Sequence, residues 1–310
     1  MERNLENGGG INVAKICVLT CAPGYREDMG PHCRLLESAL GMVPEYQLPE
    51  YRLPEYRLPE YRQWTDPGDL SKFSLVLPLL AWGYPYDPAR WFALLDTLEA
   101  DGIHIANPVS ILRWNTDKAY LTELADKGIA VVPTVITPQL DDAALRDAAA
   151  HFGTSDLIIK PPISGGAYGT YRISLGDSVP EDVAGARMMI QPFLPAISSE
   201  GEYSLLYFNG KFSHAVNKWP KTGDFRVQDY LGGTEVAVSP PADALALAEA
   251  ALTAAPDICL YARADMLRDP HGVMRLMELE LIEPSLFFKF APDGGAMFAQ
   301  AVRDRIDYKR

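Results

Sequence analysis

Apolar runs of strand length alternate with amphipathic segments over the first third of the chain. The apolar runs are AKICVLTC at 14–21, FSLVLPLLAW at 73–82 and IHIANP at 103–108. A helical stretch is expected around 31–41. PARWFALLDTLEADG at 88–102 places large apolar side chains at helical spacing before a closing glycine. Strands that alternate with helices predict a small parallel α/β unit.

From residue 114 the pattern changes to groups of strand-like runs with helices between them. The expected helices are WNTDKAYLTELADKGI, DDAALRDAAAHFG, PADALALAEAALTAA and GGAMFAQAVRDRI. The first should be capped by Asn115 or Thr116 and end at Gly128. The expected strands are VVPTVIT, DLIIKP, YRISL, ARMMIQPF, YSLLYFNG, KFSHAVNK, ICLYARADML and VMRLMELELIE. Antiparallel strands with helices to one side predict an α+β half with a deep cleft.

The sequence LPEYR occurs three times in succession inside the first unit, at 48–52, 53–57 and 58–62. A period of five fits neither a strand nor a helix, and a proline in each copy prevents a continuous helix. The copies are therefore expected to be extended or polyproline-like. Two interpretations stay open. We favour a tandem duplication that lengthens a surface connection over a peptide ligand for a partner domain.

The composition is that of an ordinary globular protein of 310 residues, with 48% hydrophobic and 22% charged residues. Its 28 basic and 41 acidic residues give a net charge of −13, which argues against a general nucleic-acid binder. No apolar run approaches the roughly 20 residues of a membrane span, and the N-terminus lacks the pattern of a signal peptide. The four cysteines form no CxxC pair, so we expect ordinary thiols in a reducing cytoplasm.

A glycine-rich segment, SGGAYGT, lies between two of the strand-like runs. Glycines let backbone N–H groups close on a phosphate, so Ser164, Gly165 and Gly166 are candidates for phosphate binding, although a tight hairpin has the same sequence pattern. Lys160 favours the phosphate interpretation, because a lysine at the end of an apolar run needs a partner when it is buried. Lys118, in the preceding predicted helix, is a second candidate.

Three carboxylates occur on the last two predicted strands. Glu278 and Glu280 are two residues apart and therefore share a face. If the strands pair as a hairpin across RDPHG, Asp265 joins them. Such a cluster needs cations, and Mg²⁺ favours oxygen ligands and phosphate. A solvated sheet face is the alternative. Basic residues elsewhere could hold a γ-phosphate or a substrate carboxylate, or form surface ion pairs; they are Lys218, Arg226 and Arg263.

The order of these features resembles that of the ATP-grasp carboxylate–amine ligases. The resemblance covers about residues 70 to 307. QPFLPAISSEGEYSLLYFNGKFSHAVNK is similar to bacterial glutathione synthetase. NPVSILRWNTDKAYL and MELELIEPSLF look more like the branch that contains the D-cycloserine-forming ligase, which closes O-ureido-D-serine to a ring. Residues 1–70 match only in general plan.

The resemblance implies an ATP-grasp fold of the α/β and α+β classes. The domains would be a preATP-grasp-like parallel α/β domain at 1–110 with the repeat as an insert at 48–62, a small central subdomain at 111–190 with the glycine-rich loop, and a C-terminal subdomain at 191–310 with the carboxylates. It also implies roles for single residues. Lys118 and Lys160 would bind ATP phosphates, backbone groups around Gln191, Phe193 and Leu194 would bind adenine, Glu202 would reach the ribose, Asp265, Glu278 and Glu280 would hold Mg²⁺, and Lys218 and Arg226 would face the γ-phosphate and the acyl phosphate.

The sequence departs from glutathione synthetase at two positions of this site. Glu280 stands where that enzyme has Asn, which keeps an oxygen ligand and adds a charge. Ser204 stands where it has Arg, which puts in doubt an ATP contact there and counts against glutathione synthetase itself.

The expected function is an ATP- and Mg²⁺-dependent ligase that activates a small amino-acid carboxylate as an acyl phosphate for attack by an amine. Intramolecular cyclisation is our first choice, and intermolecular dipeptide or amide formation the second. A nucleotide-sensing scaffold built around the LPEYR repeat is the alternative of another class. We expect no nucleic-acid or membrane partner. A homodimer is expected because members of this family are often dimers.

Overall fold

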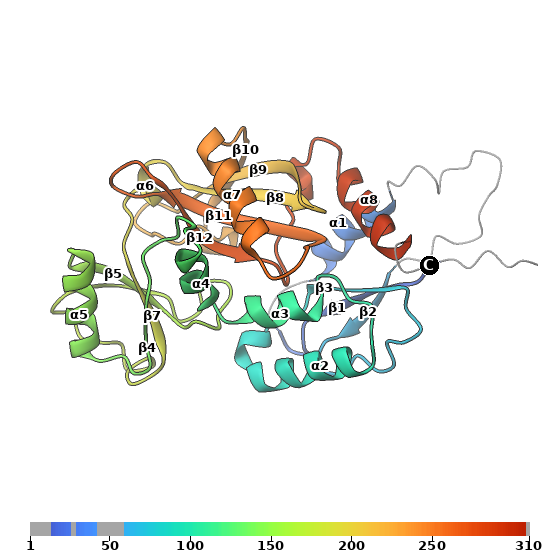
Figure 1. Ribbon diagram of the computed structural model, residues 1–310, viewed down its shortest axis with the longest axis horizontal. Helices are drawn as coiled ribbons and strands as arrows, with labels where there is room; N and C mark the ends of the chain where they lie inside the picture. The colour runs from blue at the N-terminus through green and yellow to red at the C-terminus, as the bar shows by residue number, and fades with distance from the viewer. Residues whose placement is uncertain (1–13, 26–28, 42–58, 308–310) are drawn as a thin grey trace, which may run out of the picture.

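The computed structural model describes residues 14–25, 29–41 and 59–307. Its strands form three sheets, which Figure 1 shows as separate groups of arrows. The first, in blue and cyan, lies beside helices of the same colours. A green sheet lies at the left with one helix, and a yellow to orange sheet lies above them. Helices and antiparallel sheets together confirm the predicted combination of α/β and α+β architecture.

The N-terminal sheet is parallel, with the order β2-β1-β3. Its strands are β1 (Ile16–Thr20), β2 (Glu60–Gln63) and β3 (Leu75–Leu80), and its neighbouring helices are α1 (Gly30–Gly41), α2 (Pro88–Ala100) and α3 (Val109–Thr116). Val18 belongs to the apolar cluster of α1, while Cys17 and Leu19 belong to that of α2. Both faces are thus covered, as a parallel sheet requires. The strand predicted at 103–108 is wrong, because only an isolated bridge joins Ile105 to Val76.

The third LPEYR copy contributes most of β2. Glu60 and Tyr61 pair with Cys17 and Val18 of β1, and the Tyr61 hydroxyl donates a 2.9 Å hydrogen bond to Glu37. These residues are extended, as predicted, but they belong to the sheet and not to a surface connection. The first two copies, at 48–57, lie outside the described residues.

The second sheet is antiparallel, with the order β4-β7-β5-β6. Its strands are β4 (Val135–Thr137), β5 (Asp156–Lys160), β6 (Tyr171–Ser174) and β7 (Met188–Pro192). Helix α5 (Asp142–Phe152) packs on it through Leu145 and Ala148. The Asp141 side chain caps the start of α5, and Gly153 ends it in the left-handed conformation. The sheet therefore presents β5 and β7 beside each other.

The third sheet is antiparallel and five-stranded, with the order β10-β9-β8-β11-β12. Its strands are β8 (Glu202–Phe208), β9 (Lys211–Trp219), β10 (Thr234–Val238), β11 (Tyr261–Arg268) and β12 (Met274–Glu280). The remaining helices are α4 (Tyr120–Asp126), α6 (Ala196–Ser199), α7 (Ala242–Ala254) and α8 (Ala296–Asp307). Helices α4 and α7 share an apolar cluster with this sheet. Helix α8 packs with α1, the N-terminal sheet and strand β8, and Figure 1 shows α1 and α8 side by side.

The single helix predicted for 114–129 is wrong. Helix α3 ends at Thr116, Asp117 adopts an extended conformation, and α4 begins at Tyr120. The Lys118 N–H donates to the Pro162 carbonyl at 2.8 Å, a bond that a continuous helix would not allow. Asn115 and Thr116 therefore lie inside α3 and do not cap a helix.

The division into domains at residues 110 and 190 stays a prediction. Strand β7 crosses the second boundary, and α8 of the C-terminal range packs on the N-terminal sheet.

All four cysteines are free thiols, as expected. Within the described ranges, no helix combines the length and apolar character needed to cross a membrane.

Candidate functional site

A cleft of about 1230 Å³ receives side chains from the second and third sheets and from loops and turns of the N-terminal unit. Every residue that the sequence singled out for phosphate, adenine, ribose, metal or substrate binding lines this cleft. They are spread along the chain from Lys118 to Glu280, so the fold has brought distant segments to one place. The role of each residue nevertheless stays a prediction.

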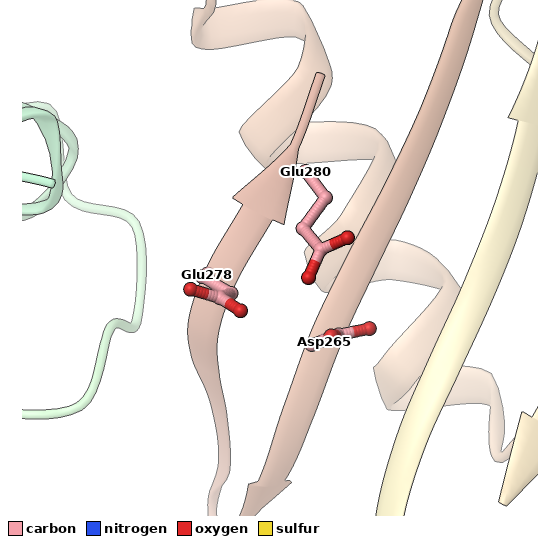
Figure 2. Close-up of side chains that lie close together, drawn as sticks. All are labelled: Asp265, Glu278 and Glu280. Carbon is pink, nitrogen blue, oxygen red and sulfur yellow. The ribbon is translucent and has the colours of Figure 1, made fainter. Parts of the chain in front are cut away.

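The three predicted metal carboxylates lie together on β11 and β12. The strands pair antiparallel, with Asp265 opposite Glu278 and Arg263 opposite Glu280. One carboxylate oxygen from each acid lies within 4.8 Å of the others. Figure 2 shows Asp265 on one strand with Glu278 and Glu280 reaching towards it from the next. Three converging carboxylate oxygens fit a hard divalent cation such as Mg²⁺.

Basic side chains interleave with this cluster. The Arg263 guanidinium donates to Asp265 at 2.7 Å and also contacts Glu280. Lys218 Nζ lies 3.1 Å from Asp265 and contacts Glu202. Burial opposes ionisation of Asp265, but Arg263 and Lys218 more than offset it and hold its pKa well below its usual range. Burial together with the neighbouring acids raises the pKa of Glu280 in spite of Arg263.

Ser204 contributes to the same cluster. Its hydroxyl donates a 2.6 Å hydrogen bond to Asp265 from the adjacent strand β8. The position at which glutathione synthetase has Arg thus orients an acid of the cluster.

Two lysines face the cluster from the other side of the cleft. Lys160 is 8% exposed, and burial lowers its pKa, partly offset by Glu278. It makes no ion pair within the described part of the chain. Lys118 Nζ donates to the Ser164 carbonyl and lies 3.5 Å from Glu278. Burial alone would raise the pKa of Glu278, but Lys118 and Lys160 outweigh it and lower that pKa.

The glycine-rich loop connects β5 to β6 and closes one side of the cleft. Gly166 has a φ of +57°, which favours glycine. The Tyr230 hydroxyl donates to the Gly166 carbonyl, and the Tyr86 ring packs edge-on against Tyr168 at 4.8 Å between centroids. The loop is therefore held from both the N-terminal and the C-terminal units.

The predicted adenine contacts lie where β7 ends. The Phe193 N–H donates to the Asp156 carbonyl at 2.9 Å, so that donor is already used. The Gln191 side chain donates to Thr134 at 2.8 Å. The Leu194 N–H donates to no backbone carbonyl among those described, which leaves it as the donor for a base.

Arg226 lies in the loop between β9 and β10, where it pairs with Asp224 at 2.8 Å. It is more exposed than Lys218 and Arg263, and it lines the same cleft.

Two side chains that the sequence did not assign to the site hold in place the strand that carries Glu278 and Glu280. Asn115 donates to the Leu279 carbonyl at 2.8 Å and accepts from the Leu281 N–H at 3.0 Å. The Tyr120 hydroxyl donates to the same carbonyl and accepts from the Leu279 N–H. They occupy the free edge of β12, where another strand would pair.

Comparisons with known proteins agree with this geometry. No protein-family profile matches the chain. The cycloserine biosynthesis protein DcsG of Streptomyces lavendulae is 30% identical over 260 residues, or 77% of this chain and 85% of that protein. A glutathione synthetase of Prochlorococcus marinus (strain MIT 9313) is 27% identical over 161 residues, or 48% of this chain and 49% of that protein.

Solved structures extend the comparison to nearly the whole chain. The crystal structure of D-cycloserine synthetase DcsG matches with a TM-score of 0.79 and 26% identity, over 94% of this chain and 100% of that one. The ATP-grasp ligase PsnB, solved with a minimal precursor, Mg and ADP, matches with a TM-score of 0.60 and 16% identity, over 94% of this chain and 97% of that one. The likeness to PsnB concerns the fold alone.

Proposed function

This chain belongs to the ATP-grasp ligases, which form C–N bonds, and from that membership we propose that it activates the carboxylate of a small amino-acid derivative with ATP. The activated species would be an acyl phosphate, which an amine attacks with loss of phosphate. The predicted ATP-grasp fold and the predicted resemblance to the cycloserine branch and to glutathione synthetase are confirmed. ATP, Mg²⁺ and the roles of single residues belong to the proposal.

The proposal rests on one observation: three clustered carboxylates and two lysines line the same cleft. Asp265, Glu278 and Glu280 would hold Mg²⁺, which neutralises charge on transferring phosphoryl oxygens. Lys118 and Lys160 would bind phosphate oxygens of ATP. The Leu194 N–H would donate a hydrogen bond to the adenine, and Glu202 would bind the ribose. None of these roles needs a covalent enzyme nucleophile.

The chain's own residues would act by position and charge. Lys218 and Arg263 are buried cations beside the acids, and Arg226 lines the same cleft. Together they would stabilise the negative charge on the acyl phosphate and on the tetrahedral intermediate that follows. The glycine-rich loop would exclude water, which otherwise hydrolyses an acyl phosphate. Holding the two reacting groups together contributes up to roughly 7–11 kcal/mol in such reactions.

We favour intramolecular cyclisation of a small amino-acid derivative, and with it a place in antibiotic biosynthesis. The support is the 30% identity to a cycloserine biosynthesis protein, across 85% of that protein's length. Intermolecular amide or dipeptide formation is the second candidate, because the chain also matches a glutathione synthetase over 161 residues at 27% identity. A requirement for one amino-acid substrate supports cyclisation, and a strict requirement for two excludes it.

The nucleotide-sensing scaffold is disfavoured by the intact carboxylate cluster, since sensing alone does not need three acids within 4.8 Å. Removal of 48–57 tests it without touching β2. Loss of a partner interaction with unchanged turnover would support a scaffold role for the repeat.

The test of the proposed function is Mg²⁺-dependent ADP release with a panel of amino acids that includes both enantiomers of O-ureido-serine. Mass spectrometry of the products follows each reaction, and Asp265→Asn serves as the inactive control. ADP release together with a closed ring or a new amide is the expected result. Nucleotide binding without ADP release on any member of the panel would contradict the proposal.

A further inference from the structure

Glu283 lies in the cleft beside the proposed nucleotide site without belonging to the metal cluster. It follows the end of β12 by three residues and lines the cleft. A Cβ placed on Gly165 would lie 3.9 Å from a Glu283 carboxylate oxygen and 3.8 Å from Pro85 Cγ. The carboxylate therefore lies where the glycine-rich loop meets the turn at Tyr84–Tyr86 of the N-terminal unit.

The neighbouring acids of the cleft each have a cation, and Glu283 does not. Glu202, Asp265, Glu278 and Glu280 pair with Lys218, Arg263 or Lys118. In the part of the chain that the structure describes, Glu283 makes no ion pair, and its hydrogen bond comes from its own backbone. It also stands outside the group of three acids that could share a metal ion.

An uncompensated carboxylate at this point is unfavourable unless a ligand brings positive charge. Burial raises the pKa of Glu283 to about 8, although Lys118 partly offsets the effect. A nucleoside triphosphate near the glycine-rich loop would add negative charge beside Glu283. Glu283 is therefore unsuited to contact the nucleotide, and it is suited to a cation on the other reactant.

We propose that Glu283 binds the α-ammonium group of the amino-acid substrate and so selects amino acids over other carboxylic acids. The inference rests on the proposed function, because it assigns a contact to the substrate of that reaction. An ion pair between a half-buried carboxylate and an ammonium is a charge-assisted hydrogen bond, and it fixes orientation as well as affinity. Binding here would place the α-carbon between the N-terminal unit and the phosphate-binding loop.

The test compares two ligands on three proteins. The ligands are O-ureido-D-serine and its counterpart in which hydrogen replaces the α-amino group. The proteins are the wild type, Glu283→Gln, and Glu200→Gln as a control acid that pairs with Arg268 outside the cleft lining. Calorimetry measures both affinities with saturating Mg²⁺ and a non-hydrolysable ATP analogue. We expect wild type and Glu200→Gln to prefer the ammonium ligand at least tenfold, and Glu283→Gln to bind both ligands within twofold.

ADP release measured in parallel separates this inference from the proposed function. A lost preference in Glu283→Gln, with unchanged melting temperature and nucleotide affinity, supports the assignment even if the wild type releases no ADP. In that case the proposed ligase reaction on this substrate is wrong, whereas the assignment of Glu283 to the ammonium group stands. A wild type without preference, or a variant that keeps the tenfold preference, overturns the assignment whether or not ADP is released.

Discussion

Lys160 and Glu280 both line the proposed nucleotide site, and their substitution should have different consequences. Lys160→Ala removes a buried ammonium that has no ion pair among the described residues. We expect it to raise the dissociation constant of ATP roughly tenfold or more, since hydrogen bonds to charged groups contribute about 1.5–3 kcal/mol.

Glu280→Gln removes one charge from the proposed metal cluster and should lower Mg²⁺-dependent turnover by about 100-fold, while ATP still binds.

Calorimetry for ATP and steady-state ADP release measure the two effects separately. Lys127→Ala is the matched control, because Lys127 is exposed and donates to the Ala254 carbonyl away from the cleft. If Lys160→Ala and Glu280→Gln both keep the turnover and the ATP affinity of the wild type, the assignment of the nucleotide and metal site to this cleft is wrong.

The convergence of the three carboxylates was predictable from local sequence, whereas single contacts around them were not. Glu278 and Glu280 share a face because strand side chains alternate, and a short turn forces Asp265 beside them. Glu283 gave no such signal, since its importance depends on the approach of Gly165 from more than 100 residues away. The pairing of Lys218 with Glu202 and Asp265 likewise depends on the order of strands in the sheet.

At the scale of elements, tertiary contacts override local helix propensity at residues 117–119. The sequence there favours one helix, but the bond from the Lys118 N–H to Pro162 breaks it into α3 and α4. The break aims the Lys118 side chain at Ser164 and Glu278. A deviation from the expected element therefore creates part of the candidate site. Strand β2 escaped prediction because its sequence repeats a motif with no strand period.

Asn115 links helix α3 to the edge of β12, the strand that carries Glu278 and Glu280. Asn115→Ala would leave the Leu281 N–H without its acceptor and remove one donor from the Leu279 carbonyl. Since each buried unsatisfied group costs about 1–3 kcal/mol, we expect a loss of roughly 2–3 kcal/mol in the free energy of unfolding. The Mg²⁺ concentration needed for half-maximal turnover should rise as well, because β12 carries Glu278 and Glu280.

Chemical denaturation and a Mg²⁺ titration of ADP release measure these two quantities. Ser110→Ala is the control on the same helix, with only a 3.4 Å exposed contact to Asp257. A stability loss in Asn115→Ala without any change in the Mg²⁺ requirement would show that the side chain stabilises the fold but does not position the acids.

At the scale of the whole molecule, the cleft is lined by segments that lie far apart in the sequence, from Ala22 to Phe287. The glycine-rich loop is held by Tyr86 of the N-terminal unit and by Tyr230 in the segment between β9 and β10. The proposed nucleotide would add contacts to β5, β7, β11 and β12 at once. Its binding energy should therefore appear as stability of the entire fold and not of one sheet.

We accordingly expect Mg²⁺ with a non-hydrolysable ATP analogue to raise the melting temperature. At about 100 times the dissociation constant, a ligand specific for the native state contributes roughly 2.7 kcal/mol, or about 5 °C for a chain of this size. Mg²⁺ or the analogue alone should give less than half of that rise, because the three acids repel an unaccompanied triphosphate. Differential scanning calorimetry measures the shift, and Asp265→Asn should lose the part that needs Mg²⁺. An equal rise with and without Mg²⁺ would show that the carboxylate cluster takes no part in nucleotide binding.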